Sequence, residues 1–177
     1  MRLAGVPFLC AALFVCGCSS LPNPLDPFTP DFTALPADEL RRVAAAIEQS
    51  VQKGDPDAVL QSTDRVSLES PLIQQALRTR TLRNERVAEL LQSGVAYEMR
   101  NGLITMNNTR DYKKNTSSRD KDSNARVVGD ENSSRWMLYE NLLKINGWPS
   151  RSLSEVRSIF FEARLEAMRP GEHYETE

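Results

Sequence analysis

The sequence lacks most of the side chains on which metal sites and nucleophilic catalysis depend. Its 177 residues include one histidine, His173, and three cysteines, all within the first 18 positions. One histidine is too few for a histidine-based metal site, and it leaves Ser-His-Asp catalysis dependent on a residue of what we expect to be an exposed C-terminal tail. No glycine-rich phosphate-binding loop is present either. We therefore expect no metal, no cofactor and no enzymatic activity.

Excess charge and long hydrophobic runs are also scarce. The formal net charge is −2, so the chain has no general signature of nucleic-acid binding. The longest apolar run, Leu3 to Val15, is too short to span a bilayer as a helix and is interrupted by Pro7. With Arg2 before it, the run is typical of a secretory signal peptide. Two alternative interpretations are a buried apolar N-terminal helix with incidental cysteines and a plain signal peptide with Cys18 merely nearby.

The end of this run points to a lipid anchor. It closes in Val15-Cys16-Gly17-Cys18, where small Gly17 suits the position before a cleaved bond. The stretch resembles the lipobox of bacterial lipoproteins, in which a peptidase cuts before the cysteine and that cysteine is acylated. The resemblance implies a signal peptide over residues 1–17, a lipid such as palmitate on Cys18 and no disulfide in the mature chain. Ser19 then favours the outer membrane, with the domain facing the periplasm.

A proline-rich stretch follows the cysteine. Residues 18–36 contain five of the ten prolines. Such a segment extends by about 3.1 Å per residue, so it spans roughly 50–60 Å. One interpretation is a tether that lifts the domain off the membrane. The other is a segment that folds back, with Phe28 and Phe32 packed on the domain.

The remaining residues predict a small, mostly α-helical domain with one short β-hairpin. We divide it into an N-terminal helical segment at 37–69 and a main domain at 70–177. Apolar residues at spacings of three and four, with their caps, predict helices from Asp38 to Gly54, from Pro71 to Gly94, from Val127 to Ile145 and from Ser152 to Met168. Asn101-Gly102, between two β-friendly runs, predicts the hairpin. Residues 107–126 predict a polar loop, whose basic side chains either face solvent or contact anionic headgroups or glycan.

Several short motifs occur in a recognisable order. Glu131-Asn132-Ser133-Ser134-Arg135 precedes Leu138-Tyr139, and the last helix leads into Arg169-Pro170-Gly171-Glu172-His173-Tyr174; upstream, Arg80 and Arg83 precede Gly94, Glu98 and Gly102-Leu103. Over about 71–174 this order resembles the YdbL-like family of small periplasmic proteins. The resemblance implies an association with an AsmA-like bridging protein in lipid transport between membranes. The chain departs from the family in its own lipobox, in the 107–124 insertion and in Ser134, where the family expects Asp.

The candidate site residues are Glu98, Glu131, Asn132, Arg135 and Tyr174, with a structural or a partner-binding role. Glu131 is expected near a helix start, where its charge suits the helix dipole. Asn132 and Arg135 lie one turn apart and are expected to bind the hairpin backbone or Glu98. The same Glu98 and Glu131 are a candidate acid and base pair for glycan hydrolysis.

The function that follows is a non-enzymatic envelope lipoprotein that binds another envelope protein, in lipid transport or assembly between membranes. A glycan-binding or peptidoglycan-acting enzyme is one alternative, and a lipid-binding carrier is another. We expect an envelope protein as partner and no nucleic acid.

Overall fold

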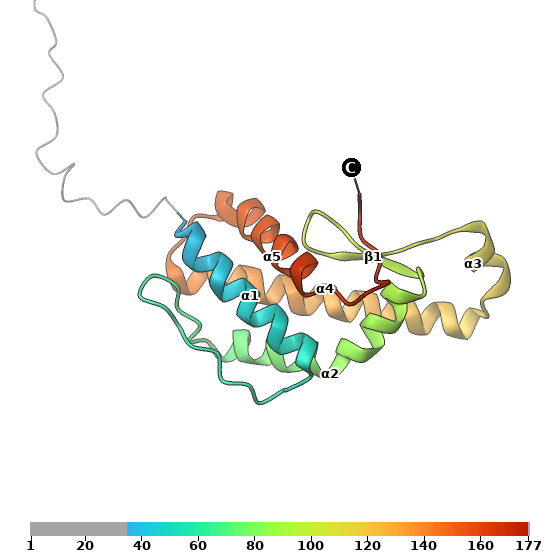
Figure 1. Cartoon of the computed structure of the whole chain (residues 1–177), viewed down its shortest axis with the longest axis horizontal. Coiled ribbons are helices and arrows are strands. Elements are labelled where there is room, and N and C mark those ends of the chain that lie inside the picture. Colours follow the sequence, from blue (N-terminus) through green and yellow to red (C-terminus); the bar gives the residue numbers. More distant parts are fainter. Residues whose placement is uncertain (1–34, 177) are drawn as a thin grey trace, which may run out of the picture. The chain divides into compact units, whose positions relative to one another are not determined.

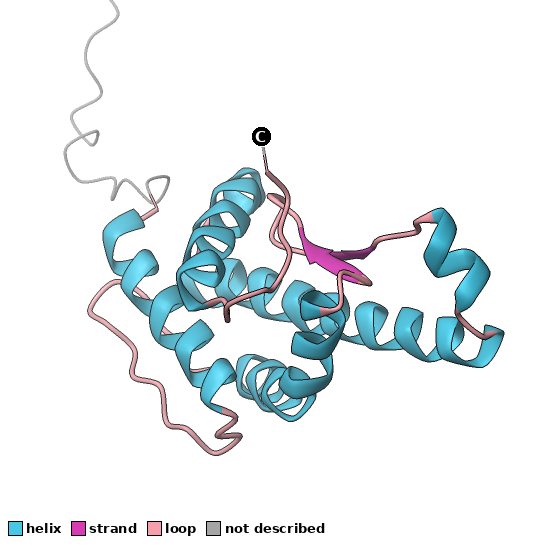
Figure 2. Ribbon diagram, turned by 45° about the vertical axis from the view of Figure 1, so that its right-hand side comes forward, coloured by secondary structure: helices cyan, strands magenta, loops and turns pink. Residues whose placement is uncertain are grey.

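A computed structural model describes residues 35–176. Within this range the chain forms five α-helices, one short 3₁₀ helix and one two-stranded antiparallel hairpin, as Figure 2 shows. The predicted mostly helical fold with a single hairpin is therefore confirmed. The predicted signal peptide, Cys18 and residues 18–34 of the tether, with Phe28 and Phe32, lie outside the described residues.

The first two helices follow their sequence signals. Helix α1 (Ala37–Lys53) buries its apolar face and ends at Gly54, whose φ of 75° is the left-handed conformation that glycine adopts without strain. The N-cap position is occupied by Pro36. Asp38, where the sequence predicted the start of the helix, lies in its first turn. Helix α2 (Pro71–Gln92) has proline at its first position, where the missing N–H costs nothing.

The predicted polar loop at 107–126 is wrong. Most of it is helical: α3 spans Arg110–Asn115, and α4 spans Ser118–Asn146 and so begins nine residues earlier than expected. Two side-chain caps explain this, because Thr109 Oγ1 accepts from the Tyr112 N–H and Ser117 Oγ accepts from the Asp120 N–H, both at 3.1 Å. Capping satisfies backbone donors that a polar segment would otherwise expose to water.

The helices pack around one main apolar core. After the 3₁₀ turn Ser150–Ser152, helix α5 (Leu153–Ala167) packs against α1, and α4 packs against α2 (Figure 1). Tyr139 of α4 and Phe160 of α5 meet in this core with ring centroids 5.1 Å apart. A smaller apolar cluster joins α2 and α4 to the hairpin. No described helix is long and apolar enough to cross a membrane.

The hairpin lies against α4 and receives the C-terminal segment. Strands β1 (Ala96–Glu98) and β2 (Ile104–Met106) pair antiparallel, with Glu98 opposite Ile104. His173 and Tyr174 are exposed, as expected, but the segment is also held to the hairpin, because Tyr174 forms a parallel bridge with Glu98 of β1. The Glu98 N–H donates to the His173 carbonyl at 3.0 Å, and the Glu175 N–H donates to the Glu98 carbonyl at 2.8 Å. The C-terminal segment is therefore joined to the free edge of β1 by one isolated bridge.

Candidate functional site

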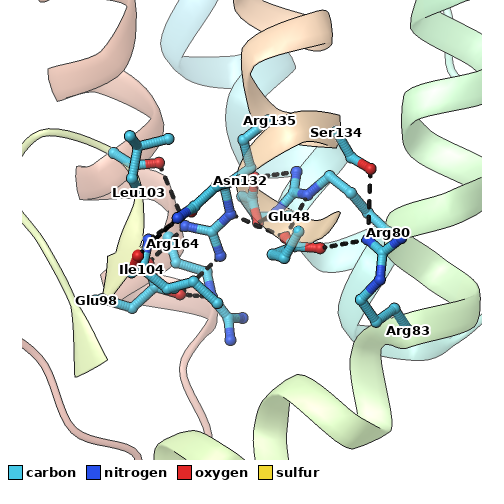
Figure 3. A network of polar contacts seen from close by, with 12 residues as sticks. Glu48, Arg80, Arg83, Glu98, Leu103, Ile104, Asn132, Ser134, Arg135 and Arg164 are labelled. Carbon is cyan, nitrogen blue, oxygen red and sulfur yellow. Dashed lines mark hydrogen bonds and ion pairs between the residues drawn. The ribbon is translucent and has the colours of Figure 1, made fainter. Parts of the chain in front are cut away.

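A chain of buried ion pairs runs through the domain, and Figure 3 shows most of it. Its members are arginines and glutamates whose side chains are at most 5% exposed. They come from four helices, the hairpin and the C-terminal segment. In order along the network they are Glu48 of α1, Arg80 of α2, Glu131 and Arg135 of α4, Glu98 of β1, Arg164 of α5, and Glu172.

The first half of the network joins α1, α2 and α4. Arg80 donates from both terminal nitrogens to the two carboxylate oxygens of Glu48, each at 2.8 Å. Its Nε donates to Glu131 Oε1 at 2.9 Å. Arg83, one turn further along α2 and partly exposed, donates to Glu131 Oε2 at 3.3 Å. Charge-assisted pairs with this two-pronged geometry fix orientation as well as distance.

The second half joins α4 and α5 to the hairpin and the C-terminal segment. Arg135 donates from Nε to Glu131 at 2.8 Å, and its two terminal nitrogens donate to Glu98 at 2.6 and 2.8 Å. Arg164 donates to Glu98 at 3.0 Å and to Glu172 at 3.3 Å. Glu98 is fully buried and belongs to a strand of only three residues, so these two arginines hold the hairpin on the helices.

Neighbouring polar groups hold the hairpin backbone. The Asn132 side chain accepts from the Ile104 N–H at 2.9 Å and donates to the Ile104 carbonyl at 2.8 Å. Tyr139 donates its hydroxyl to the Gly102 carbonyl at 2.8 Å. The contacts expected of Asn132 with the hairpin backbone and of Arg135 with Glu98 are thus confirmed. By pairing with both backbone groups of Ile104, Asn132 caps the outer edge of β2.

The network favours the charged form of the Glu131 and Glu98 carboxyls, whose pKa values it lowers. Burial alone would raise the pKa of the Glu131 carboxyl, but the charges of Arg80 and Arg135 outweigh it and lower that pKa to about 2. Burial also opposes ionisation of Glu98, and the neighbouring charges of Arg135 and then Arg164 lower its pKa. Neither carboxyl can therefore serve as a proton donor near neutral pH.

This geometry does not suit Glu98 and Glu131 to act as the acid and base of glycan hydrolysis. The side chains are 0% and 3% exposed, and each is bound by at least two arginines. A glycosidic bond has no access to either carboxylate, and the acid of such a pair must be protonated. What the arrangement does chemically is neutralise charge, because four glutamates face the three buried arginines and the partly exposed Arg83.

Two further expectations about the motif need correction. Glu131 does not lie near a helix start, because α4 begins at Ser118 and Glu131 sits in its middle. The helix dipole therefore does not explain its charge, and its arginine partners do. Tyr174 pairs with Glu98 through its backbone, but its side chain is 48% exposed and takes no part in the ion pairs.

The candidate site residues left out four members of the network. Arg80 and Glu172 were noted only in the order of motifs, and Glu48 and Arg164 were not noted at all. A usable signal exists for Glu48 and Arg164. Glu48 follows Ala44 by one turn on the apolar face of α1, and Arg164 follows Phe160 by one turn on the apolar face of α5. A charged residue at a position that the helical period assigns to the core requires a buried partner of opposite charge. Glu172 lies beyond the last helix and has no such signal.

Several open hollows lie on the described surface of the domain, and one of them is beside helix α2. It has a volume of about 550 Å³ and lies between residues 56–60 and helix α2, with Val59 and Arg78 among its lining residues. Val59 is 89% exposed, and Leu82, one turn beyond Arg78 on α2, is 71% exposed. Among the described residues, no group of histidine, cysteine and acidic side chains is placed to hold a metal ion.

Comparison with family models, curated proteins and solved structures finds no match for this chain.

Proposed function

We propose that the protein is a lipid-anchored envelope protein whose helical domain binds another envelope protein without catalysing a reaction, in lipid transport or assembly between membranes. The observation that carries this proposal is Val15-Cys16-Gly17-Cys18 at the end of a short apolar run. It supports export and acylation at Cys18, and Ser19 supports the outer membrane with the domain in the periplasm. The YdbL-like order of motifs supports an AsmA-like bridging protein as the partner.

The buried network supports a binding domain rather than a catalytic one. Its charged groups satisfy one another, and no buried side-chain nitrogen or oxygen among the described residues lacks a hydrogen-bond partner. Glu98, Glu131 and Arg135 are therefore occupied in holding the domain together. Recognition of a partner then falls to the surface, where exposed Val59 lines the open hollow beside α2 and Leu82 is exposed on the same helix.

The anchor is tested by replacing Cys18. The unchanged chain should incorporate a palmitate analogue and remain in the outer-membrane fraction, because two or more acyl chains anchor stably. Cys18→Ser should abolish labelling and release the protein from the membrane, whereas Cys16→Ser should behave like the unchanged chain. Equal labelling of both variants would contradict the assignment of Cys18.

The binding surface is tested by photo-crosslinking in intact envelopes. A photoreactive residue at Leu82 or Val59 should give one recurring adduct with an envelope protein, and one at Glu140, an exposed residue of α4, should not. Bait alone at both positions would count against a protein partner. A changed muropeptide profile would favour the peptidoglycan-acting alternative, and co-purified lipid would favour the carrier.

A further inference from the structure

Helix α3 presents a basic face that no part of the described domain neutralises. The helix lies beyond the hairpin, at the end of the domain where α4 begins (Figures 1 and 2). All of its residues except Tyr112 are exposed. Over residues 110–126 the sequence has six basic and three acidic side chains, so this end of the domain carries a positive charge that the chain as a whole does not.

The spacing of the cations sets their direction. Arg110, Lys113 and Lys114 occupy positions i, i+3 and i+4, which share one face of a helix. Tyr112 is on the opposite face, where its hydroxyl accepts from Asn124 Nδ2 of α4 at 3.1 Å. Because Tyr112 faces the domain, the three cations face away from it.

Three arginines elsewhere on the domain have acidic partners. Arg41 pairs with Asp38 at 3.0 Å, Arg86 with Glu89 at 2.6 Å and Arg169 with Glu85 at 2.7 Å. By contrast, within the described range no ion pair includes a cation of α3. The helix is also held in place, by its Thr109 cap and by the Tyr112 contact with Asn124, which Arg86 of α2 supports at 2.9 Å.

We propose that the α3 face of Arg110, Lys113 and Lys114 docks on anionic lipid headgroups of the membrane that carries the anchor. This inference rests on the membrane attachment proposed above. Three exposed cations on one face of a helix suit a diffuse negative surface better than one small anion. Reach would permit the contact, because α4 is 29 residues or about 43 Å long and a proline-rich stretch of this length, if extended, would reach roughly 50–60 Å.

The size of the effect follows from the charges. Each basic residue close to an anionic leaflet increases binding about fivefold, so three give about a hundredfold at low ionic strength. The anchor already places the domain at the surface, and the basic face therefore sets how the domain is oriented there. Salt should remove this contact without removing the anchor.

The test uses the full acylated chain in vesicles of phosphatidylcholine, with and without 30% phosphatidylglycerol. Amide exchange over residues 110–115 should slow about tenfold with the anionic lipid only, and 0.5 M salt should reverse the slowing. K113E/K114E should abolish it. The matched control K144E/R151E makes the same charge change at exposed residues outside α3 and should retain it.

Three results would overturn the proposal. The first is equal amide exchange over residues 110–115 in vesicles with and without phosphatidylglycerol. The second is that K144E/R151E abolishes the slowing as K113E/K114E does. The third is slowing in native envelopes but not in anionic vesicles, which would assign the face to a protein or glycan. Vesicle flotation distinguishes failure of this proposal from failure of the lipid anchor. A chain that fails to float with zwitterionic vesicles lacks the anchor, whereas exchange at α3 still reports whether anionic lipid is bound.

Discussion

Replacing Arg135 by methionine should lower the free energy of unfolding more than the same replacement of an exposed arginine. Methionine keeps much of the side-chain length but removes the donors that reach Glu98 and Glu131. Glu98 would then remain fully buried with Arg164 as its one charged partner. Removing one member of a buried ion pair costs about 3–5 kcal/mol, because the other charge stays desolvated without full compensation.

The loss predicted for Arg135→Met is large compared with the whole free energy of unfolding. A domain of this size is stable by about 5–15 kcal/mol, so the variant should lose a fifth or more of its free energy of unfolding. With a urea dependence of about 2 kcal/mol per molar, the midpoint should fall by about 2 M. Arg41→Met is the matched control, because Arg41 is half-exposed and pairs with an almost fully exposed Asp38. An exposed pair of this kind contributes about 0–1 kcal/mol.

Urea unfolding followed by the fluorescence of Trp136 and Trp148 measures both variants. A double variant, Arg135→Met with Glu98→Gln, should recover about 1–3 kcal/mol relative to the sum of the two single changes, because the desolvated carboxylate is then gone. If Arg135→Met shifted the midpoint no more than Arg41→Met does, the network would not hold the hairpin in the way described. The same conclusion would follow if the double variant showed no coupling.

The sequence predicts those elements whose own residues carry their signal. Apolar residues at helical spacing locate α1, α2 and α5, and Asn101-Gly102 locates the turn of the hairpin. Helix α3 and the first turns of α4 carry no apolar stripe, so a polar loop was the natural expectation. They are held by Asn124, which bonds both Tyr112 and Arg86, and the second contact depends on the placement of α2.

The candidate site was predictable in part for a related reason. Glu98, Asn132 and Arg135 were recognisable as a motif, and their mutual contacts follow from one helical turn placed beside a hairpin. The partners Glu48 and Arg164 are separated by 32 and 66 residues from the groups they bind, and no spacing rule relates them. Only the packing of α1 on α5 and of α2 on α4 brings the two halves of the network together.

Two further predictions concern acid and the hairpin turn. Because the arginines lower the pKa of Glu131 from 4.5 to about 2 on folding, it contributes about 3 kcal/mol of stability above pH 4.5 that is lost as the pH falls towards 2. Urea midpoints measured between pH 5 and 2.5 should show this loss, and their dependence on pH should be weaker in Glu131→Gln. Gly102→Ala should destabilise more than Gly54→Ala, since both have φ near 75° but only a Cβ at Gly102 meets the Arg157 carbonyl, at 2.9 Å. Both changes carry about 1–2 kcal/mol of backbone strain, so equal urea midpoints would show that the turn does not press on α5.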